Sequence, residues 1–151
     1  MLIFLDFDGV VHPQFEGQAT PKDLVFCHLP RIEPVFREYD VEIVISSTWR
    51  IDFTLERLKE HFSPDIRKKI IGATPVIDAG NDQFMPYRRE KEILAWLTQN
   101  SREHDDWLAL DDAAWQFCVH RDKLVACIWY QGFDDKADAE LRMKLDARFP
   151  G

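Results

Sequence analysis

The chain has 151 residues, of which 46% are apolar and 30% charged, and its formal net charge is −8 at pH 7. This composition predicts a single globular domain over residues 1–151 with a substantial core, and it lacks the ~18-residue apolar run of a transmembrane helix. The negative charge disfavours broad binding to nucleic acid or anionic membranes. A local basic patch could oppose that trend, and a carboxylate site for a divalent cation would make part of the acidity functional.

The N-terminus does not have the pattern of a signal peptide. It lacks a basic segment, and Asp6 and Asp8 interrupt its apolar run. Cys27, Cys118 and Cys127 are odd in number and show no C-x-x-C spacing. They therefore predict buried, reduced thiols in a cytoplasmic protein.

Short apolar runs alternate with amphipathic patterns along the chain, and the first run, LIFL, leads directly into DFDG. The runs have strand length and are mostly apolar on both faces, whereas the patterns between them repeat at helical spacing. In chain order, the predicted elements are a strand over 2–5, a helix over 30–40, a strand over 41–46, a helix over 54–62, a strand over 68–73, a helix over 88–100, strands over 107–112 and 124–130, and a helix over 134–149.

Strands that alternate with helices are typical of an α/β fold. The pattern predicts three layers, with a doubly wound, Rossmann-like and mainly parallel sheet covered by helices on both faces. Ligands of such folds bind beyond the carboxyl ends of the strands. The residues that end each strand are therefore the candidate functional positions.

Polar groups follow three of the predicted strands. They are Asp6-Phe7-Asp8, Ser46-Ser47-Thr48 and Asp111-Asp112, and the basic run Arg88-Arg89-Glu90-Lys91 begins a helix before the last of these. Each has another interpretation when taken alone. In the same order, the first three could be a solvated turn, a helix N-cap and a cap of the following turn, and the basic run could be a solvated helix face. Together, at one edge of a doubly wound sheet, they favour a shared site.

Phosphoryl transfer from a phosphomonoester is the chemistry that these groups suit. Asp6 and Asp8 are two residues apart, so on an extended chain their carboxylates point to the same side. A cation is needed there to offset the repulsion between the two negative charges. Oxygen ligands favour Mg²⁺. One carboxylate can then attack phosphorus, a second can transfer the proton, and a hydroxyl and a basic side chain can hold the phosphoryl oxygens.

At these residues the chain resembles the haloacid-dehalogenase (HAD) superfamily of phosphotransferases. DFDGVV is similar to its first motif, VISST to its second and WLALDD to its fourth, while its third motif is a single Lys or Arg. VISSTWR, IIGATP, REKEILAWL and the late QGF further resemble small HAD domains found in some multi-activity RNA-repair proteins.

The resemblance implies a role for each candidate residue. Asp6 would be the nucleophile and a Mg²⁺ ligand, and Asp8 the general acid/base, with its backbone carbonyl also on the metal. Asp112 would complete the metal site, directly or through water, with Asp111 in support. Ser46 would hydrogen-bond a phosphoryl oxygen.

The same resemblance leaves the third motif open between Arg89 and Lys91. Gly9, which permits the turn after the first motif, and Ser47 are expected beside the substrate. Arg50 could contact a phosphate or, alternatively, pair with an acidic residue at a helix start.

The spacing of the motifs leaves no room for a folded cap domain over 10–45 or 47–88. An open site favours a bulky substrate such as a nucleic-acid end or a phosphoprotein, although an oligomeric partner could cover it, and the loop at 74–87 could act as a local lid. Arg67-Lys68-Lys69 predicts a solvated face and is the best candidate for an RNA backbone contact. The five tryptophans predict core or edge packing.

The sequence thus predicts a Mg²⁺-dependent phosphatase that works through an aspartyl-phosphate intermediate. One alternative is a receiver-like signalling domain, which the position of the first motif disfavours because receivers carry their phosphoacceptor on a middle strand of the chain. The other is a catalytically inactive HAD-type domain that only binds phosphate. Nothing in the sequence fixes the oligomeric state.

Overall fold

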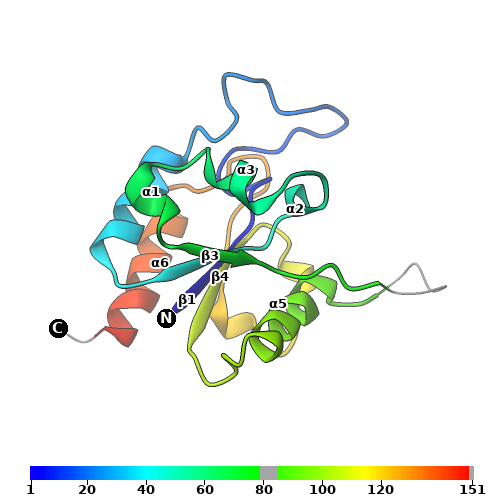
Figure 1. The fold of residues 1–151 in the computed structure, drawn as a ribbon. Coiled ribbons are helices and arrows are strands. Elements are labelled where there is room, and N and C mark those ends of the chain that lie inside the picture. The colour runs from blue at the N-terminus through cyan, green and yellow to red at the C-terminus, as the bar shows by residue number, and fades with distance from the viewer. Residues whose placement is uncertain (79–84, 150–151) are drawn as a thin grey trace.

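A five-stranded parallel sheet forms the centre of the computed structural model, which describes residues 1–78 and 85–149 (Figure 1). The strand order is β3-β2-β1-β4-β5. The strands are β1 (Leu2–Leu5), β2 (Glu42–Ile45), β3 (Ile70–Ala73), β4 (Trp107–Asp111) and β5 (Leu124–Ala126). The predicted parallel sheet is confirmed, and the first strand lies at its centre.

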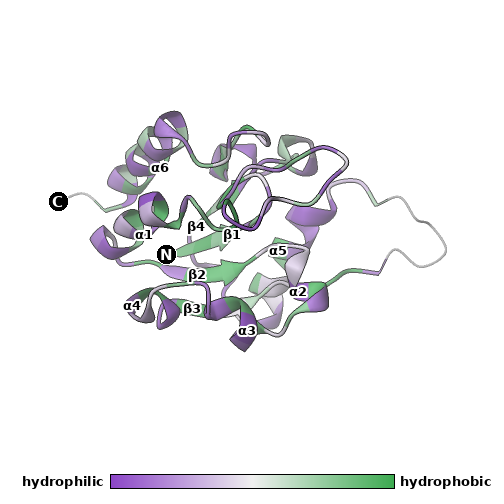
Figure 2. Ribbon diagram, turned by 90° about the horizontal axis from the view of Figure 1, so that it is seen from above, coloured by the Kyte–Doolittle hydropathy of each residue, from purple (hydrophilic) through white to green (hydrophobic). Residues whose placement is uncertain are grey.

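Helices cover both faces of this sheet, which confirms the three-layer architecture (Figures 1 and 2). One face packs against α1 (Leu29–Glu38), α3 (Leu55–Lys59), α4 (Pro64–Arg67) and α6 (Asp135–Arg148). The other packs against α5 (Arg88–Gln99). A short helix, α2 (Trp49–Asp52), follows β2, and two 3₁₀ turns, η1 (Ala114–Gln116) and η2 (Arg121–Lys123), lie between β4 and β5.

The side chains of β1 alternate between the two layers of the core. Ile3 and Leu5 join the cluster that contains α1 and α6, whereas Leu2 and Phe4 join the cluster around α5. All four are fully buried. This is the strand alternation expected of a sheet covered on both faces, and it explains why LIFL carries no polar residue.

Two elements are less than two thirds as long as the sequence predicted. The helix expected over 54–62 is regular only in α3, where Thr54 caps it by accepting the Arg57 N–H at 3.2 Å. The strand expected over 124–130 ends at Ala126 because the chain turns, with the Gly132 N–H donating to the Ile128 carbonyl at 2.8 Å. The apolar residues of that turn therefore leave the sheet.

None of the helices in the described parts of the chain is long and apolar enough to cross a membrane. The three cysteines are free thiols. Cys127 is buried as predicted, Cys27 is half-buried, and Cys118 is exposed, contrary to the prediction.

Candidate active site

Three carboxylates gather at the carboxyl ends of β1 and β4. The two strands are neighbours with Leu5 opposite Leu110, so Asp6 and Asp111, which come next, lie side by side. Asp112 follows, and one oxygen from each of the three lies within 4.8 Å of the others. Asp6 and Asp111 are buried, and Asp112 is half-buried.

The electrostatics of this cluster oppose full ionisation. Burial raises the pKa of Asp6 well above its ordinary value, the charge of Asp111 raises it further, and Arg89 only partly offsets both effects. Burial, followed by the charge of Asp111, raises the pKa of Asp112 to about 6. A positive charge beyond that of Arg89 would therefore stabilise the ionised cluster.

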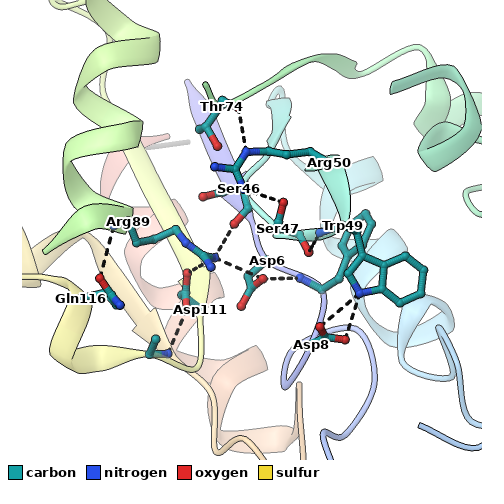
Figure 3. A network of polar contacts seen from close by, with 12 residues as sticks. Asp6, Asp8, Ser46, Ser47, Trp49, Arg50, Thr74, Arg89, Asp111 and Gln116 are labelled. Atoms are coloured by element: carbon teal, nitrogen blue, oxygen red, sulfur yellow. Dashed lines mark hydrogen bonds and ion pairs between the residues drawn. The ribbon is translucent and has the colours of Figure 1, made fainter. Parts of the chain in front are cut away.

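Arg89, in the first turn of α5, is the cation that the structure brings to these carboxylates (Figure 3). Its Nη1 lies 2.9 Å from Asp111 Oδ2 and 3.2 Å from Asp6 Oδ1, and it donates to the carbonyl oxygen of Ser46. Lys91 is exposed on the same helix. Of the two residues that the sequence left open for the third motif, Arg89 is the one beside Asp6.

The donor set of the cluster fits a divalent metal such as Mg²⁺. Asp6, Asp111 and Asp112 offer only carboxylate oxygens, the hard ligands that Mg²⁺ prefers. The raised pKa values of Asp6 and Asp112 indicate that the negative charge of the cluster is only partly neutralised without a cation. The predicted ligands Asp6, Asp111 and Asp112 therefore come together, whereas the side chain of Asp8 lies outside this group.

Asp8 is held by two side-chain donors from distant parts of the chain. The indole Nε1 of Trp49 donates to Oδ1 at 3.1 Å and to Oδ2 at 3.2 Å, and His12 Nε2 lies 2.8 Å from Oδ1. Burial raises the pKa of Asp8, but the hydrogen bonds from His12 and Trp49 outweigh it and leave the pKa below its ordinary value. Asp8 stays half-buried, with 34% of its side chain exposed, and so remains accessible to a substrate.

His12 is fully buried, and its second ring nitrogen defines its tautomer. The backbone N–H of Phe26 donates to Nδ1 at 3.1 Å, so the proton of the neutral ring is on Nε2, which then donates to Asp8. The structure thus places His12 behind the carboxylate of Asp8, where it contacts that side chain and not the cavity.

Ser46 and Ser47 follow β2 but have different surroundings. Both are buried, and the hydroxyl of Ser46 is among the buried polar atoms of the described residues that have no hydrogen-bond partner. Ser47 Oγ instead accepts the Trp49 N–H at 3.2 Å. Ser46 thus retains the capacity to bind a phosphoryl oxygen, and Ser47 stabilises the entry into α2.

Arg50, one candidate for a phosphate contact, directs its donors to protein acceptors. Nε and Nη1 donate to the carbonyls of Thr74 and Ser47, each at 2.8 Å, and Nη2 forms an ion pair of 2.8 Å with Glu92. The alternative reading, an arginine at a helix start that pairs with an acidic residue, describes this environment. Arg50 supports the site from behind.

A cavity of ≈ 550 Å³ opens above the carboxylates. Asp6, Asp8, Thr48 and Arg89 line it, and so do Trp115 and Trp129. Trp115 is 68% exposed and Trp129 39% exposed, so the prediction of core or edge packing is wrong for both. The contact of Trp49 with Asp8 was also not predicted from the sequence, because the only signal for it was the position of Trp49 directly after the second motif.

The remaining sequence candidates lie elsewhere. Residues 67–69 directly precede β3 and so lie at the amino end of that strand, opposite the carboxylates. Arg67 donates to backbone carbonyls of Lys59, Glu60 and Phe62, which gives it a structural role. Residues 79–84 of the loop predicted as a lid lie outside the described residues.

Comparison with known proteins gives one match. A family model described as "HAD domain in Swiss Army Knife RNA repair proteins" matches residues 2–137, a segment that contains all the site residues described above. No curated protein and no solved structure matches the chain.

Proposed function

Because the chain belongs to the family of HAD domains in Swiss Army Knife RNA repair proteins, we propose that it is a Mg²⁺-dependent phosphomonoester hydrolase acting on nucleic-acid ends. The observation that carries this proposal is the environment of Asp6. It is a buried carboxylate between Asp111, Asp112 and Arg89, with a second, accessible carboxylate, Asp8, on the same cavity.

Asp6 is the proposed nucleophile. The backbone N–H of Phe7 donates to its Oδ1 at 2.8 Å, and Arg89 lies 3.2 Å from the same atom, so the orientation of the carboxylate is fixed before substrate binds. A carboxylate oxygen attacks phosphorus, the bond from phosphorus to the ester oxygen breaks, and an aspartyl phosphate forms. Mg²⁺ bound to the carboxylate cluster would keep Asp6 ionised and offset the charge of the phosphate.

Asp8 is the proposed general acid and base. In its protonated form it donates a proton to the leaving ester oxygen and becomes a carboxylate. The carboxylate then takes a proton from the water that attacks the aspartyl phosphate, which releases phosphate, restores Asp6 and returns the proton to Asp8. Its hydrogen bonds to His12 and Trp49 hold the carboxylate in place for both steps. The Ser46 hydroxyl and Arg89 would bind phosphoryl oxygens.

The strand order argues against the receiver-like alternative. Receiver and other flavodoxin-like domains have the order 2-1-3-4-5, with a switch point between the first and third strands. Here β1 lies between β2 and β4, and the acidic cluster is built from these neighbours β1 and β4. This arrangement supports an enzyme whose nucleophile follows the first strand.

Hydrolysis of phosphate esters by the purified protein tests the proposal. We expect Mg²⁺-dependent release of phosphate from phosphorylated oligonucleotides, and its loss in Asp6→Asn without a change in circular dichroism. Asp122→Asn is the matched control, because Asp122 is exposed and lies near the amino end of β5, away from the site. Full activity of Asp6→Asn, or activity unaffected by EDTA, would contradict the mechanism.

A panel of substrates tests the choice of nucleic acid. Oligonucleotides with 3′- or 5′-phosphate, phosphopeptides and small phosphate esters should be compared by kcat/KM. A preference for phosphopeptides would leave the phosphatase mechanism intact and overturn the proposed substrate.

A further inference from the structure

Two exposed tryptophans border the same cavity as the carboxylates. Trp115 lies in η1, directly beyond β4, and Trp129 lies in the turn beyond β5. Both indoles are partly exposed, and both belong to the cavity that also contains the carboxylate cluster. The mechanism proposed above uses neither of them.

The backbone around each tryptophan is fixed by hydrogen bonds. The Trp129 carbonyl accepts the Gln14 N–H at 2.8 Å, which joins its turn to the loop after β1. Buried Glu90 accepts the N–H groups of Cys118 and His120 at 3.2 and 2.7 Å and so anchors the segment that follows Trp115. Both indoles are therefore presented from anchored backbone, which lowers the entropy cost of stacking against a ligand.

The composition of the cavity changes from its base to its rim. Asp6 and Arg89 at the base are buried or nearly so, and they suit the phosphate and its cation. Exposed Gln14 and Glu16 line the cavity together with the tryptophans. A nucleotide likewise joins a phosphate, through sugar hydroxyls, to an aromatic base.

Electrostatics restrict how much nucleic acid the cavity can hold. Glu16, Asp8 and Asp112 all line it, and the chain as a whole carries a charge of −8, so further phosphates beyond the reacting one are repelled. Stacking on an aromatic side chain does not depend on charge and tolerates every base. Aromatic contact with one base is thus the means of recognition that this cavity offers.

We propose that Trp115 and Trp129 form a stacking platform for the base of the phosphorylated terminal nucleotide. This inference rests on the proposed function and specifies its substrate as a single nucleotide at the end of a chain. A phosphotyrosine is the competing ligand. Its ring is bonded to the phosphate oxygen itself and would lie at the base of the cavity, whereas a nucleobase is separated from the phosphate by the sugar and reaches the exposed indoles.

The test compares substrates with and without a base. Kinetics of the wild-type protein, Trp115→Ala and Trp129→Ala are measured with adenosine 5′-monophosphate, adenosine 3′-monophosphate, ribose 5-phosphate and glycerol phosphate. We expect the wild-type protein to favour the nucleotides. Each alanine variant should lose about 5- to 150-fold in kcat/KM for them, mainly through a higher KM, because stacking contributes ground-state binding.

Two further variants separate stacking from general damage. Trp115→Phe retains a ring and should restore most of the preference for a base. Met143→Ala truncates a side chain that is 63% exposed on α6, outside the lining of the cavity, and should change nothing. Hydrolysis of glycerol phosphate and ribose 5-phosphate should be unchanged in all four variants.

The outcomes distinguish the failure of this inference from the failure of the proposed function. Two results overturn the inference and leave the proposed phosphatase activity intact. One is hydrolysis of glycerol phosphate without any preference for substrates that carry a base, and the other is a preference for phosphotyrosine that depends on the tryptophans. If no ester is hydrolysed, the binding of adenosine 3′-monophosphate to the protein in EDTA tests the platform separately. Quenching of tryptophan fluorescence by adenosine 3′-monophosphate that is lost in the alanine variants supports the platform, and its absence overturns it.

Discussion

Arg50 and Glu92 form an ion pair of 2.8 Å in which the two side chains are only 6% and 4% exposed. The pair joins α2, directly after the second motif, to the same helix that presents Arg89. Glu92 Oε2 also accepts the N–H of Ile77 at 3.1 Å. A single buried carboxylate thus connects three segments behind the candidate active site.

Removing that carboxylate should destabilise the protein strongly. Glu92→Ala leaves the guanidinium of Arg50 buried without its partner, and we expect a loss of about 3–5 kcal/mol in the free energy of unfolding. Glu60→Ala is the control, because its ion pair of 2.7 Å with Arg57 is exposed and should contribute about 1 kcal/mol or less. Urea denaturation measures both, and equal losses would refute the structural role of the buried pair.

Gly9 is required by the position of Asp112. Its φ is +78°, and a methyl group on its α-carbon would lie 2.6 Å from Asp112 Cγ. Gly9→Ala should therefore displace the Asp112 carboxylate and reduce Mg²⁺-dependent activity, besides a backbone cost of about 1–2 kcal/mol. Gly17→Ala is matched in backbone, with φ +72° and no atom within 4 Å of the added methyl. It should show the backbone cost alone, and an equal loss of activity in both variants would contradict the steric argument.

Arg89 and Lys91 should differ sharply in their contribution to turnover. Arg89 contacts both Asp6 and Asp111, and its removal deletes the charge that would face the phosphoryl group, so Arg89→Ala should lower kcat by about 10²–10³-fold. Lys91→Ala removes an exposed charge two residues along the same helix and should leave kcat unchanged. Steady-state kinetics on a phosphorylated oligonucleotide measure kcat for both variants. Equal kcat values would contradict the assignment of the third motif to Arg89.

The ambiguity between these two basic residues shows what periodicity alone can predict. Residues two apart on a helix point in different directions, so only one of them can face the sheet edge. The start of α5 at Arg88 agrees with the prediction, so the choice depends on how the helix packs against the sheet through Ile93, Trp96 and Leu97. By contrast, periodicity does predict that the apolar runs before Asp6 and Asp111 are parallel strands that end at the same edge of the sheet. The structure adds that these two strands are neighbours.

Trp49 and Trp129 illustrate what the sequence could not supply. Trp49 reaches Asp8 across 41 residues of chain, a contact that depends on how α2 packs and has no local signature. Trp129 lies in an apolar run that reads as strand, but hydrogen bonds within the turn to Gly132 end β5 early. Local pattern cannot distinguish an apolar residue that enters the core from one that is exposed at the border of a cavity.

The raised pKa of Asp112 predicts how the stability of the metal-free protein depends on pH. With a folded-state value of about 6 and an ordinary value of 3.8, Asp112 retains in the folded state a proton that the unfolded chain releases. Its contribution to stability is therefore complete below pH 3.8 and is lost as pH rises through 6. Asp112→Asn, which cannot ionise, should have a higher Tm than the wild-type protein in EDTA at pH 8, and the difference should vanish near pH 4.

Addition of Mg²⁺ should reverse that order. At pH 8 the cation offsets the charge of the cluster and stabilises the wild-type protein by binding only its folded state. Asp112→Asn has lost one ligand and should gain less. Thermal unfolding with and without Mg²⁺ measures the gain in Tm of each protein. An equal gain in both would contradict the role of Asp112 as a metal ligand.

Trp49 should act on catalysis through the pKa of Asp8. Trp49→Phe keeps a ring against Phe7 and Phe26, whose centroids lie 5.7 and 5.4 Å from that of Trp49, but it deletes the N–H that donates to both oxygens of Asp8. Because that hydrogen bond lowers the pKa, the titration midpoint of the Asp8 carboxyl, followed by ¹³C NMR, should move to higher pH.

The same variant should lose stability in a defined pH range. A depressed pKa contributes stability above the ordinary value of 3.8 that disappears as pH falls through the folded-state value, so the loss in Trp49→Phe should be present at pH 7 and shrink in acid. Its kcat should fall by less than the roughly 10²–10⁴-fold expected for Asp8→Asn, since the carboxylate remains. An unchanged titration midpoint would mean that Trp49 only packs against Asp8 and does not tune it.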